Sequence, residues 1–311
     1  MNMAEQKVVV IGGTNMDING YVNAPLIYGD SNLGKIKCTP GGVGRNIAQN
    51  VAMLGKETHL ISVVGDDLYG KTLLERTAQS GVNVDKCYTL SHKTTSTYLS
   101  LLDHQGEMVA AINDMQIIDC FTPDLLAPHL DFIQQADVLI LDCNLSEQTL
   151  GWIIEHCPDN AIFVDTVSTV KALKIQPWLS QIHTLKPNRI EAETLSGIKI
   201  HNNADIERVA DWFHQQGIEH IALSLGKEGV FYSEKDGVTG WSTPFNIEVI
   251  NVTGAGDAMM AGLAVSWLDK RHLPSSIRYA QACSALALSS EFTNNPNLSN
   301  DQVLNLMEVQ Q

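Results

Sequence analysis

The stretch that decides the fold lies near the C-terminal end, where residues 250–262 read Ile-Asn-Val-Thr-Gly-Ala-Gly-Asp-Ala-Met-Met-Ala-Gly. A β-branched run over 247–252 predicts a strand, and the small and apolar residues of 258–267 predict a buried helix. The glycine turn between them would leave bare backbone N–H groups where the helix dipole is positive, so it can hold an anion. Asp257 would repel an anion, and we therefore expect it to act as a base beside one. Phosphoryl transfer to a hydroxyl requires such a pair.

Two other interpretations of this turn stay open from the stretch alone. It could be an ordinary helix start with Asp257 as the N-cap, because glycine turns before helices are common. A dinucleotide-binding fingerprint is less favoured, because Met259 occupies its third small position and the turn comes late in the chain. A P-loop is not expected, although residues 65–72 (Gly-Asp-Asp-Leu-Tyr-Gly-Lys-Thr) match its Gly-x-x-x-x-Gly-Lys-Ser/Thr spacing.

A second glycine-rich element, Pro-Gly-Gly-Val-Gly-Arg-Asn, occupies residues 40–46 and precedes a helical pattern that ends at Gly55. Gly41 and Gly42 let the backbone approach a ligand closely, and Asn46 falls at the beginning of the helix. Alone, this element is also compatible with a plain strand–helix turn. Together, the two elements resemble the two signatures of the ribokinase family, also called the phosphofructokinase-B family of sugar and nucleoside kinases.

The resemblance extends over nearly the whole chain. Further stretches similar to motifs of this family are 10–17 (Val-Ile-Gly-Gly-Thr-Asn-Met-Asp), 65–70, 186–191 (Lys-Pro-Asn-Arg-Ile-Glu) and 224–229 (Ser-Leu-Gly-Lys-Glu-Gly). The resemblance implies ATP as the phosphoryl donor, with its nucleotide-side residues at Asn188, Ser224, Gly226 and Gly229. It also implies Mg²⁺ near Glu191, held largely through water because Mg²⁺ keeps part of its hydration shell. Without the resemblance, Glu191 reads as a solvated helix residue.

The catalytic turn is expected to work as a unit. Asp257 would take the proton of the attacking hydroxyl, and the backbone N–H groups of the turn would stabilise the developing charge. The residues of this predicted anion hole are Gly254, Ala255, Gly256 and Asp257. Asn251 stands where the family often has an Asp that helps to form a monovalent-cation site, so potassium dependence stays open.

The substrate side is expected around Asp17, whose carboxylate can accept bonds from two vicinal ribose hydroxyls. A turn or helix-cap role for Asp17 stays open from the sequence alone. The residues expected to complete this grip are Asn15, Gly41, Gly42, Asn46 and, at the same rim, Asn144.

Strand-like runs alternate with helical patterns along the chain, which predicts an α/β fold with a mostly parallel central sheet covered by helices on both faces. The strand-like runs are 8–11, 59–64, 138–142, 161–165, 182–185, 220–224, 230–233 and 247–252, and the helical patterns include 45–54, 70–80, 204–216 and 258–268. We expect one ribokinase-like domain over 1–311.

Two segments, about 18–39 and 95–113, break the alternation and predict a small β lid; the second has a hairpin turn at 104–106. At the end of this hairpin, Asn113 and Asp114 could match the donors and acceptors of a uracil-type base edge, or form a polar turn. The family's lid often pairs with that of a second subunit, which implies a homodimer. A simple hairpin insertion is the alternative.

Composition limits the partners. The formal net charge is −15 and no basic run is long, which argues against a nucleic acid polymer or a membrane surface as partner. The six cysteines lack Cys-x-x-Cys spacing, so we expect reduced thiols rather than zinc. The N-terminal apolar run is too short for a signal or membrane segment, so we expect a cytoplasmic protein.

The residues therefore predict a ribokinase-like kinase that phosphorylates a primary hydroxyl of a ribose-containing small molecule, a nucleoside in our interpretation. Another sugar or nucleoside kinase of the family is the alternative within the same class. A non-catalytic nucleoside sensor is the alternative from another class, and the retained Asp257 speaks against it.

Overall fold

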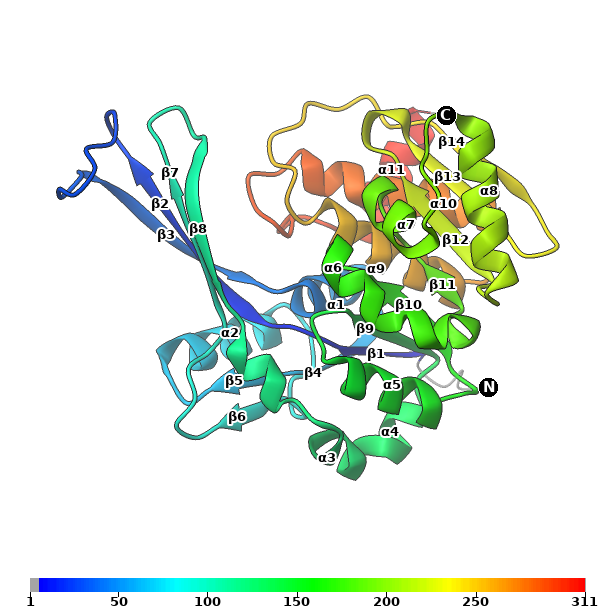
Figure 1. Cartoon of the computed structure of the whole chain (residues 1–311), viewed down its shortest axis with the longest axis horizontal. Coiled ribbons are helices and arrows are strands. Elements are labelled where there is room, and N and C mark those ends of the chain that lie inside the picture. Colours follow the sequence, from blue (N-terminus) through cyan, green and yellow to red (C-terminus); the bar gives the residue numbers. More distant parts are fainter. Residues whose placement is uncertain (1–5, 311) are drawn as a thin grey trace.

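An eight-stranded sheet forms the centre of the computed structural model, which describes residues 6–310 (Figure 1). Its strand order is β14-β13-β12-β11-β10-β9-β1-β4. The strands from β4 to β12 are parallel, and β13 and β14 join antiparallel at one edge. Their bounds are β1 (Lys7–Ile11), β4 (Glu57–Ile61), β9 (Val138–Asp142), β10 (Ala161–Asp165), β11 (Thr184–Leu185), β12 (His220–Ser224), β13 (Val230–Glu234) and β14 (Thr239–Ser242). The predicted mostly parallel α/β sheet is confirmed.

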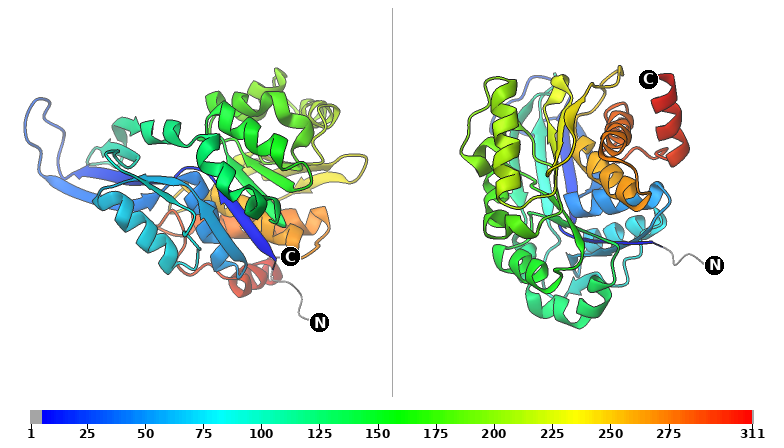
Figure 2. Two further views of the ribbon diagram at one scale, coloured as in Figure 1. Left: turned by 90° about the horizontal axis from the view of Figure 1, so that it is seen from below. Right: turned by 90° about the vertical axis from the view of Figure 1, so that its right-hand side faces the viewer.

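Helices cover both faces of this sheet, because alternate residues of each strand point to opposite sides (Figure 2). Val9 and Ile11 of β1 join one buried cluster, while Val8 and Val10 join the other. The first cluster also contains buried side chains from four helices, α5 (Glu147–His156), α6 (Thr169–Ala172), α7 (Arg189–Ser196) and α8 (Asn203–Gln215). The second cluster contains buried side chains from α1 (Val43–Met53), α9 (Ala255–Leu268), α10 (Leu273–Leu288) and α11 (Asn300–Val309).

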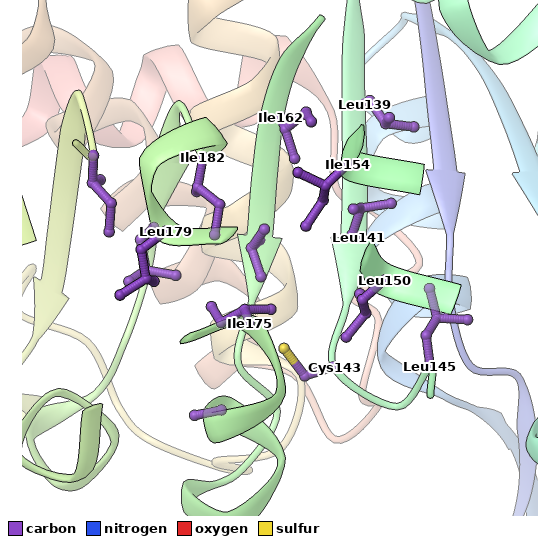
Figure 3. Close-up of a cluster of buried hydrophobic side chains, with 14 of the residues drawn as sticks. Leu139, Leu141, Cys143, Leu145, Leu150, Ile154, Ile162, Ile175, Leu179 and Ile182 are labelled. Carbon is purple, nitrogen blue, oxygen red and sulfur yellow. The ribbon is translucent and has the colours of Figure 1, made fainter. Parts of the chain in front are cut away.

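The first cluster illustrates why these segments pack as they do (Figure 3). Leu139 and Leu141 of β9 lie beside Ile154 and Leu150 of α5, and all four are fully buried. Burying a leucine or isoleucine side chain stabilises the fold by about 1.5–3 kcal/mol. The central strands are therefore apolar on both faces, as parallel sheets require.

A second, four-stranded sheet, which we call the outer sheet, projects away from the body of the molecule (Figure 1). Its order is β3 (Gly34–Gly41), β2 (Asn15–Val22), β7 (Thr97–Leu102) and β8 (Met108–Asp114). The β7–β8 turn is closed by Asp103, whose Oδ1 accepts the N–H groups of Gln105 and Glu107 at 2.8 and 3.0 Å. Gly106 provides the positive φ of +85° that this turn needs.

Smaller elements complete the described chain. A two-stranded parallel sheet pairs β5 (Val63–Gly65) with β6 (Tyr88–Leu90), and the remaining α-helices are α2 (Leu68–Gln79), α3 (Pro123–Leu126) and α4 (Leu130–Gln134). Short 3-10 helices span Gln116–Cys120, Ala127–His129, Leu173–Gln181 and Gly226–Glu228. Within residues 6–310, no helix is both long and apolar enough to cross a membrane. All six cysteines are free.

Two strand predictions need correction. The run 59–64 divides between β4 and β5, because Ser62 leaves the ladder and its hydroxyl donates to the Gly12 carbonyl at 2.7 Å. The β-branched run 247–252 is not a strand. It lies at the surface, and the N–H groups of Ile250 and Asn251 share one acceptor, the Leu288 carbonyl at the end of α10. A strand requires a neighbouring ladder, which this segment lacks.

Candidate active site

The turn before α9 needs glycine for two reasons. Gly254 caps the helix with φ +83°, a left-handed conformation that other residues rarely adopt. A Cβ at Gly254 would also lie 2.0 Å from the Thr293 carbonyl oxygen. The helix begins at Ala255, so Asp257 is its third residue and the N-cap interpretation of Asp257 is wrong. As first residues of a helix, Ala255, Gly256 and Asp257 have N–H groups without intrahelical acceptors.

The carboxyl group of Asp257 is buried and held by one strong contact. Asn46 donates through Nδ2 to Asp257 Oδ2 at 2.7 Å. Burial, reinforced by the charge of Asp165, raises the pKa of Asp257 to about 7, while Asn46 and Lys186 oppose the shift. A pKa near neutrality suits a group that must accept and then release a proton.

Lys186 brings a buried positive charge to the same place. Its Nζ lies 3.1 Å from Asp165 Oδ2, and both side chains are less than 10% exposed. Burial opposes the charge on Lys186, but Asp165, Glu191 and Asp257 outweigh it and raise its pKa. Its Nζ also lies 3.3 Å from where a Cβ on Gly256 would be, beside the turn. Lys186 opens the motif 186–191, but the sequence pattern alone indicates no role for it.

Asn188 and Glu191 form the cap of α7 and hold each other. Asn188 Oδ1 accepts the Glu191 N–H at 3.0 Å, and Glu191 Oε2 accepts the Asn188 N–H at 2.9 Å. Thr166 Oγ1 donates to the same Glu191 oxygen at 2.6 Å. Glu191 is buried, so its interpretation as a solvated helix residue is wrong. No cluster of three potential metal-ligating side chains occurs among residues 6–310.

The predicted nucleotide-side residues lie next to this cap. Ser224 ends β12, forms a bridge with Asn188, and donates its N–H to the Pro187 carbonyl at 2.9 Å. The following turn uses positive φ at Gly226 (+59°) and Gly229 (+97°). The loop 224–229 therefore borders the same edge of the sheet as α7.

Asp17 lies within β2 rather than in a turn or cap. Asn15 donates to its Oδ1 at 2.6 Å, and a Cβ on Gly41 would lie 2.3 Å from its Oδ2. Burial raises the pKa of Asp17, although Asn15 and the charge of Arg45 favour the ionised form. Gly41 is thus needed to make room for this carboxylate.

The start of α1 packs tightly against the end of β1. Gly42 has φ +97°, and a Cβ there would lie 2.5 Å from the Gly13 carbonyl oxygen. Asp142 Oδ2 accepts the N–H groups of Gly13 and Gly44 at 2.8 and 2.7 Å, which fixes both glycine loops to β9. Asn46 is the fourth residue of α1 and faces Asp257.

Asn144 follows β9 and belongs to a small polar network. Its N–H donates to Asp142 Oδ1 at 2.8 Å, and its Oδ1 accepts from Lys171 Nζ at 2.6 Å. Burial lowers the pKa of Lys171, while the charge of Asp142 favours its protonated form. No motif in the sequence indicates this contact of Lys171 with Asn144.

A cavity of about 990 Å³ lies between one face of the outer sheet and the loops 250–253 and 291–296. Residues paired across neighbouring strands share a face. The residues on the cavity face of the outer sheet are Asp17, Asn19, Tyr21, Lys37, Thr39, Tyr98, Ser100 and Leu102. Asn113 pairs with Tyr98 and shares this face, whereas Asp114 pairs with Thr97 on the other one. Both lie in β8, so they are not a turn.

The cavity and Asp257 are joined through α1. Arg45 and Asn294 line the cavity and donate hydrogen bonds to Asn46, which in turn donates to Asp257. Asn251 also borders the cavity, and its Oδ1 accepts the Thr253 N–H at 2.9 Å. The structure therefore brings the predicted substrate residues and the predicted base to one end of the parallel sheet, where ligands of α/β proteins bind.

Comparison with known proteins agrees with this geometry. Residues 5–300 match the family described as pfkB family carbohydrate kinase. The chain is 55% identical over 301 residues to the pseudouridine kinase of Escherichia coli (strain K12), covering 97% of this chain and 96% of that one. It is 42% identical to an uncharacterized sugar kinase, YeiI, of the same organism, covering 98% and 84%.

Solved structures share the whole fold. A carbohydrate kinase from Agrobacterium tumefaciens superposes with a TM-score of 0.86 at 29% identity, covering 98% of both chains. The Arabidopsis thaliana ribokinase complexed with ribose and ATP has a TM-score of 0.88 at 20% identity, covering 98% and 99%, and supports the fold alone.

Proposed function

Because the chain belongs to the pfkB family of carbohydrate kinases, we propose that it transfers the γ-phosphoryl group of ATP to the 5′-hydroxyl of pseudouridine. The 55% identity to a pseudouridine kinase over nearly all of both chains supports this substrate. The observation that carries the chemistry is the buried carboxyl of Asp257, which lies in the first turn of α9 and accepts a hydrogen bond from Asn46 at 2.7 Å.

In this proposal Asp257 is the general base. The O5′–H bond breaks as the proton passes to the free oxygen of Asp257, and the O5′–P bond forms as the bond from the γ-phosphorus to the bridging oxygen breaks. ADP leaves with that oxygen and its electron pair. Catalysis of phosphoryl transfer depends mostly on positioning and charge stabilisation. The base therefore needs only a carboxylate oxygen that points at the 5′-hydroxyl and a pKa near neutrality.

The positive groups around the turn would stabilise the charge on the transferred group. The N–H groups of Ala255, Gly256 and Asp257 point from the positive end of α9, and Lys186 adds a full charge beside Gly256. Fixed donors of this kind act strongly where water is excluded.

Mg²⁺ would bind at the cap of α7. The donor set fits, because hard oxygen ligands suit Mg²⁺ and Glu191 commits only Oε2 to hydrogen bonds within residues 6–310. Asn188 and Glu191 would hold the ion through its water ligands, and the ion would neutralise charge on the phosphates. The neighbouring loop 224–229 would carry the nucleotide.

The ribose would bind between Asp17 and α1. Asp17 and Asn15 would hold the vicinal hydroxyls, with the Gly41-Gly42 backbone packed close and Asn144 at the rim. The outer sheet would act as the lid, and Asn113 would contribute to recognition of the base from the cavity face. A site built from hydrogen-bonding groups rejects ligands that leave those groups unpaired.

The other face of the outer sheet supports a homodimer. Large apolar side chains on it are exposed, among them Ile36 (76%) and Ile112 (66%). A second copy of this chain would cover them, because an apolar sheet face in water favours association. Changing Ile112 to Glu should convert the dimer to a monomer by light scattering; a wild-type chain that is already monomeric would refute this proposal.

A substrate panel tests the proposed function. ADP release and product mass would be measured with ATP and pseudouridine, uridine, inosine or ribose, using Asp257→Asn as the control for background hydrolysis. The proposal requires the highest kcat/KM on pseudouridine, with one phosphate added at the 5′ position. Higher kcat/KM on ribose would favour the ribokinase-like alternative, and ligand binding without turnover would favour a nucleoside sensor.

A further inference from the structure

Arg45 is a buried cation that no step proposed above uses. It lies on α1, and its side chain is 2% exposed. Nε donates to the Gly41 carbonyl at 3.0 Å, and Nη1 donates to Gln49 Oε1 at 2.6 Å. Nη2 donates to the side-chain Oδ1 of the neighbouring Asn46 and, at 2.7 Å, to Asn294 Oδ1. Nη2 thus donates to two side-chain amide oxygens close to Asp257, the proposed base.

Asn294 comes from the loop near the C-terminal end and is equally committed. Its Nδ2 donates to the Asn46 carbonyl and to Asn50 Oδ1, both at 2.9 Å, while its Oδ1 accepts from Arg45. It is buried. Asn294 therefore holds both the backbone of Asn46 and the guanidinium that contacts the Asn46 side chain.

These contacts determine which way the Asn46 amide points. A guanidinium has donors only, so Asn46 must turn its Oδ1 toward Arg45. Its Nδ2 then faces Asp257, where it donates at 2.7 Å. The reversed amide would set its oxygen against a carboxylate oxygen, an arrangement that a carboxyl group tolerates only when it keeps its proton.

We propose that Arg45 and Asn294 are positioning residues that fix the Asn46 amide, so that Asp257 is held ionised with one oxygen free for the substrate hydroxyl. This inference rests on the proposed role of Asp257 as the base. Neither residue needs to touch the substrate, because each acts through Asn46. Their loss should change the proton affinity of the base more than the binding of the nucleoside.

The orientation of the Asn46 amide matters because several charged groups around Asp257 also shift the pKa of its carboxyl group. From β10, Asp165 raises the pKa of Asp257; Lys186 after β11 lowers it, and Asp142 on β9 adds a smaller increase. Burial lowers the pKa of Arg45 to about 10, against the charges of Asp17 and Asp257, so Arg45 stays protonated at neutral pH. With the pKa of Asp257 near 7, losing one donor moves its titration out of the neutral range.

The test measures the titration midpoint of Asp257 directly, by carbon NMR of aspartate carboxyl groups, with the signal assigned by its loss in Asp257→Asn. Arg45→Met should raise the midpoint by about 1 pH unit, since a hydrogen bond to a charged group has an energy of this order. Asn294→Ala should shift it in the same direction by less, because Arg45 still donates to Asn46 Oδ1. In steady state, kcat at neutral pH should fall about five-fold in Arg45→Met with little change in KM.

A double-mutant cycle separates orientation from simple charge attraction. In the Asn46→Ala background, Arg45→Met should cause almost no further shift of the midpoint. Asn295→Ala is the matched control, because Asn295 belongs to the same loop but bonds to Leu286 instead. It should leave the midpoint unchanged.

Three outcomes would overturn the inference. They are an unshifted midpoint in Asn294→Ala, an Arg45→Met shift of equal size in both backgrounds, and an equal shift in Asn295→Ala. Since the NMR midpoint needs no substrate, it stands even if pseudouridine is not phosphorylated. Failure of the proposed function is therefore distinguishable from failure of this inference.

Discussion

Replacing Asp257 by asparagine should remove most of the activity and yet stabilise the folded protein at alkaline pH. The carboxyl group is buried beside Asp165, and its pKa rises from 3.8 to about 7. One pKa unit corresponds to about 1.4 kcal/mol, so keeping this group ionised costs the folded state about 4 kcal/mol by pH 8. An amide of the same shape carries no such cost and can still accept the Asn46 hydrogen bond.

The sign of the pH dependence follows from the raised pKa. Between about pH 4 and about pH 7, the native protein retains a proton on Asp257 that the unfolded chain releases. The parent's free energy of unfolding therefore falls, through this group, as pH rises across that window. The variant lacks this contribution, so its stability advantage should grow with rising pH.

Urea unfolding of parent and variant at several pH values measures this difference in the free energy of unfolding. The contributions of the other titrating groups largely cancel when the parent value is subtracted from the variant value. From about pH 5 to about pH 8, the variant-minus-parent free energy of unfolding should increase by about 3 kcal/mol. In the same preparations, kcat should fall by roughly 10²–10⁴, since the proton acceptor is lost. A stability difference that does not vary with pH, or a kcat within a few-fold of the parent, would refute the assignment of a raised pKa and a base role to this residue.

Three further substitutions probe the rest of the site. Asp17→Ala should weaken nucleoside binding by about 1–3 kcal/mol per unpaired hydroxyl and leave ATP affinity nearly unchanged, as measured by separate titrations of the two ligands. An equal loss of affinity for both ligands would show that Asp17 has a structural role instead. Asn113→Ala should lower the ratio of kcat/KM for pseudouridine over ribose, whereas Asp114→Ala, on the opposite face, should not; equal ratios in both variants would remove Asn113 from base recognition. Asn251→Asp should increase the response of the rate to potassium relative to a bulky organic cation, and strong activation of the parent by potassium would contradict our interpretation of Asn251.

The parts of the fold and site that local patterns encode could be predicted from the sequence. The apolar strands of the central sheet and the glycine at 254 follow from backbone and burial requirements that act over a few residues. The strand prediction for 247–252 is wrong because β-branched residues indicate only a preference for extended backbone, while a strand also needs a neighbouring strand to pair with. That partner is missing here, since Ile250 and Asn251 bond to the end of α10 instead.

The network behind the base could not be predicted in this way. Arg45 and Asn294 are 249 residues apart, and nothing in the local pattern of either one indicates that they meet. A lone Arg after a glycine motif looks like a solvated residue, because Arg is mostly exposed in proteins. Lys186 was missed for the same reason, since only the fold brings Asp165 and the α9 turn to its ammonium group.

The span of the Arg45–Asn294 bond also has a consequence for how the molecule is made. The two side chains join α1 to a loop that is synthesised 249 residues later, and closing so long a loop is slow. The sheet and its helices can therefore assemble while the surroundings of Asp257 are still incomplete. A nascent or C-terminally shortened chain would hold a nearly finished scaffold with an untuned base, and catalytic competence would mark the end of folding rather than accompany collapse.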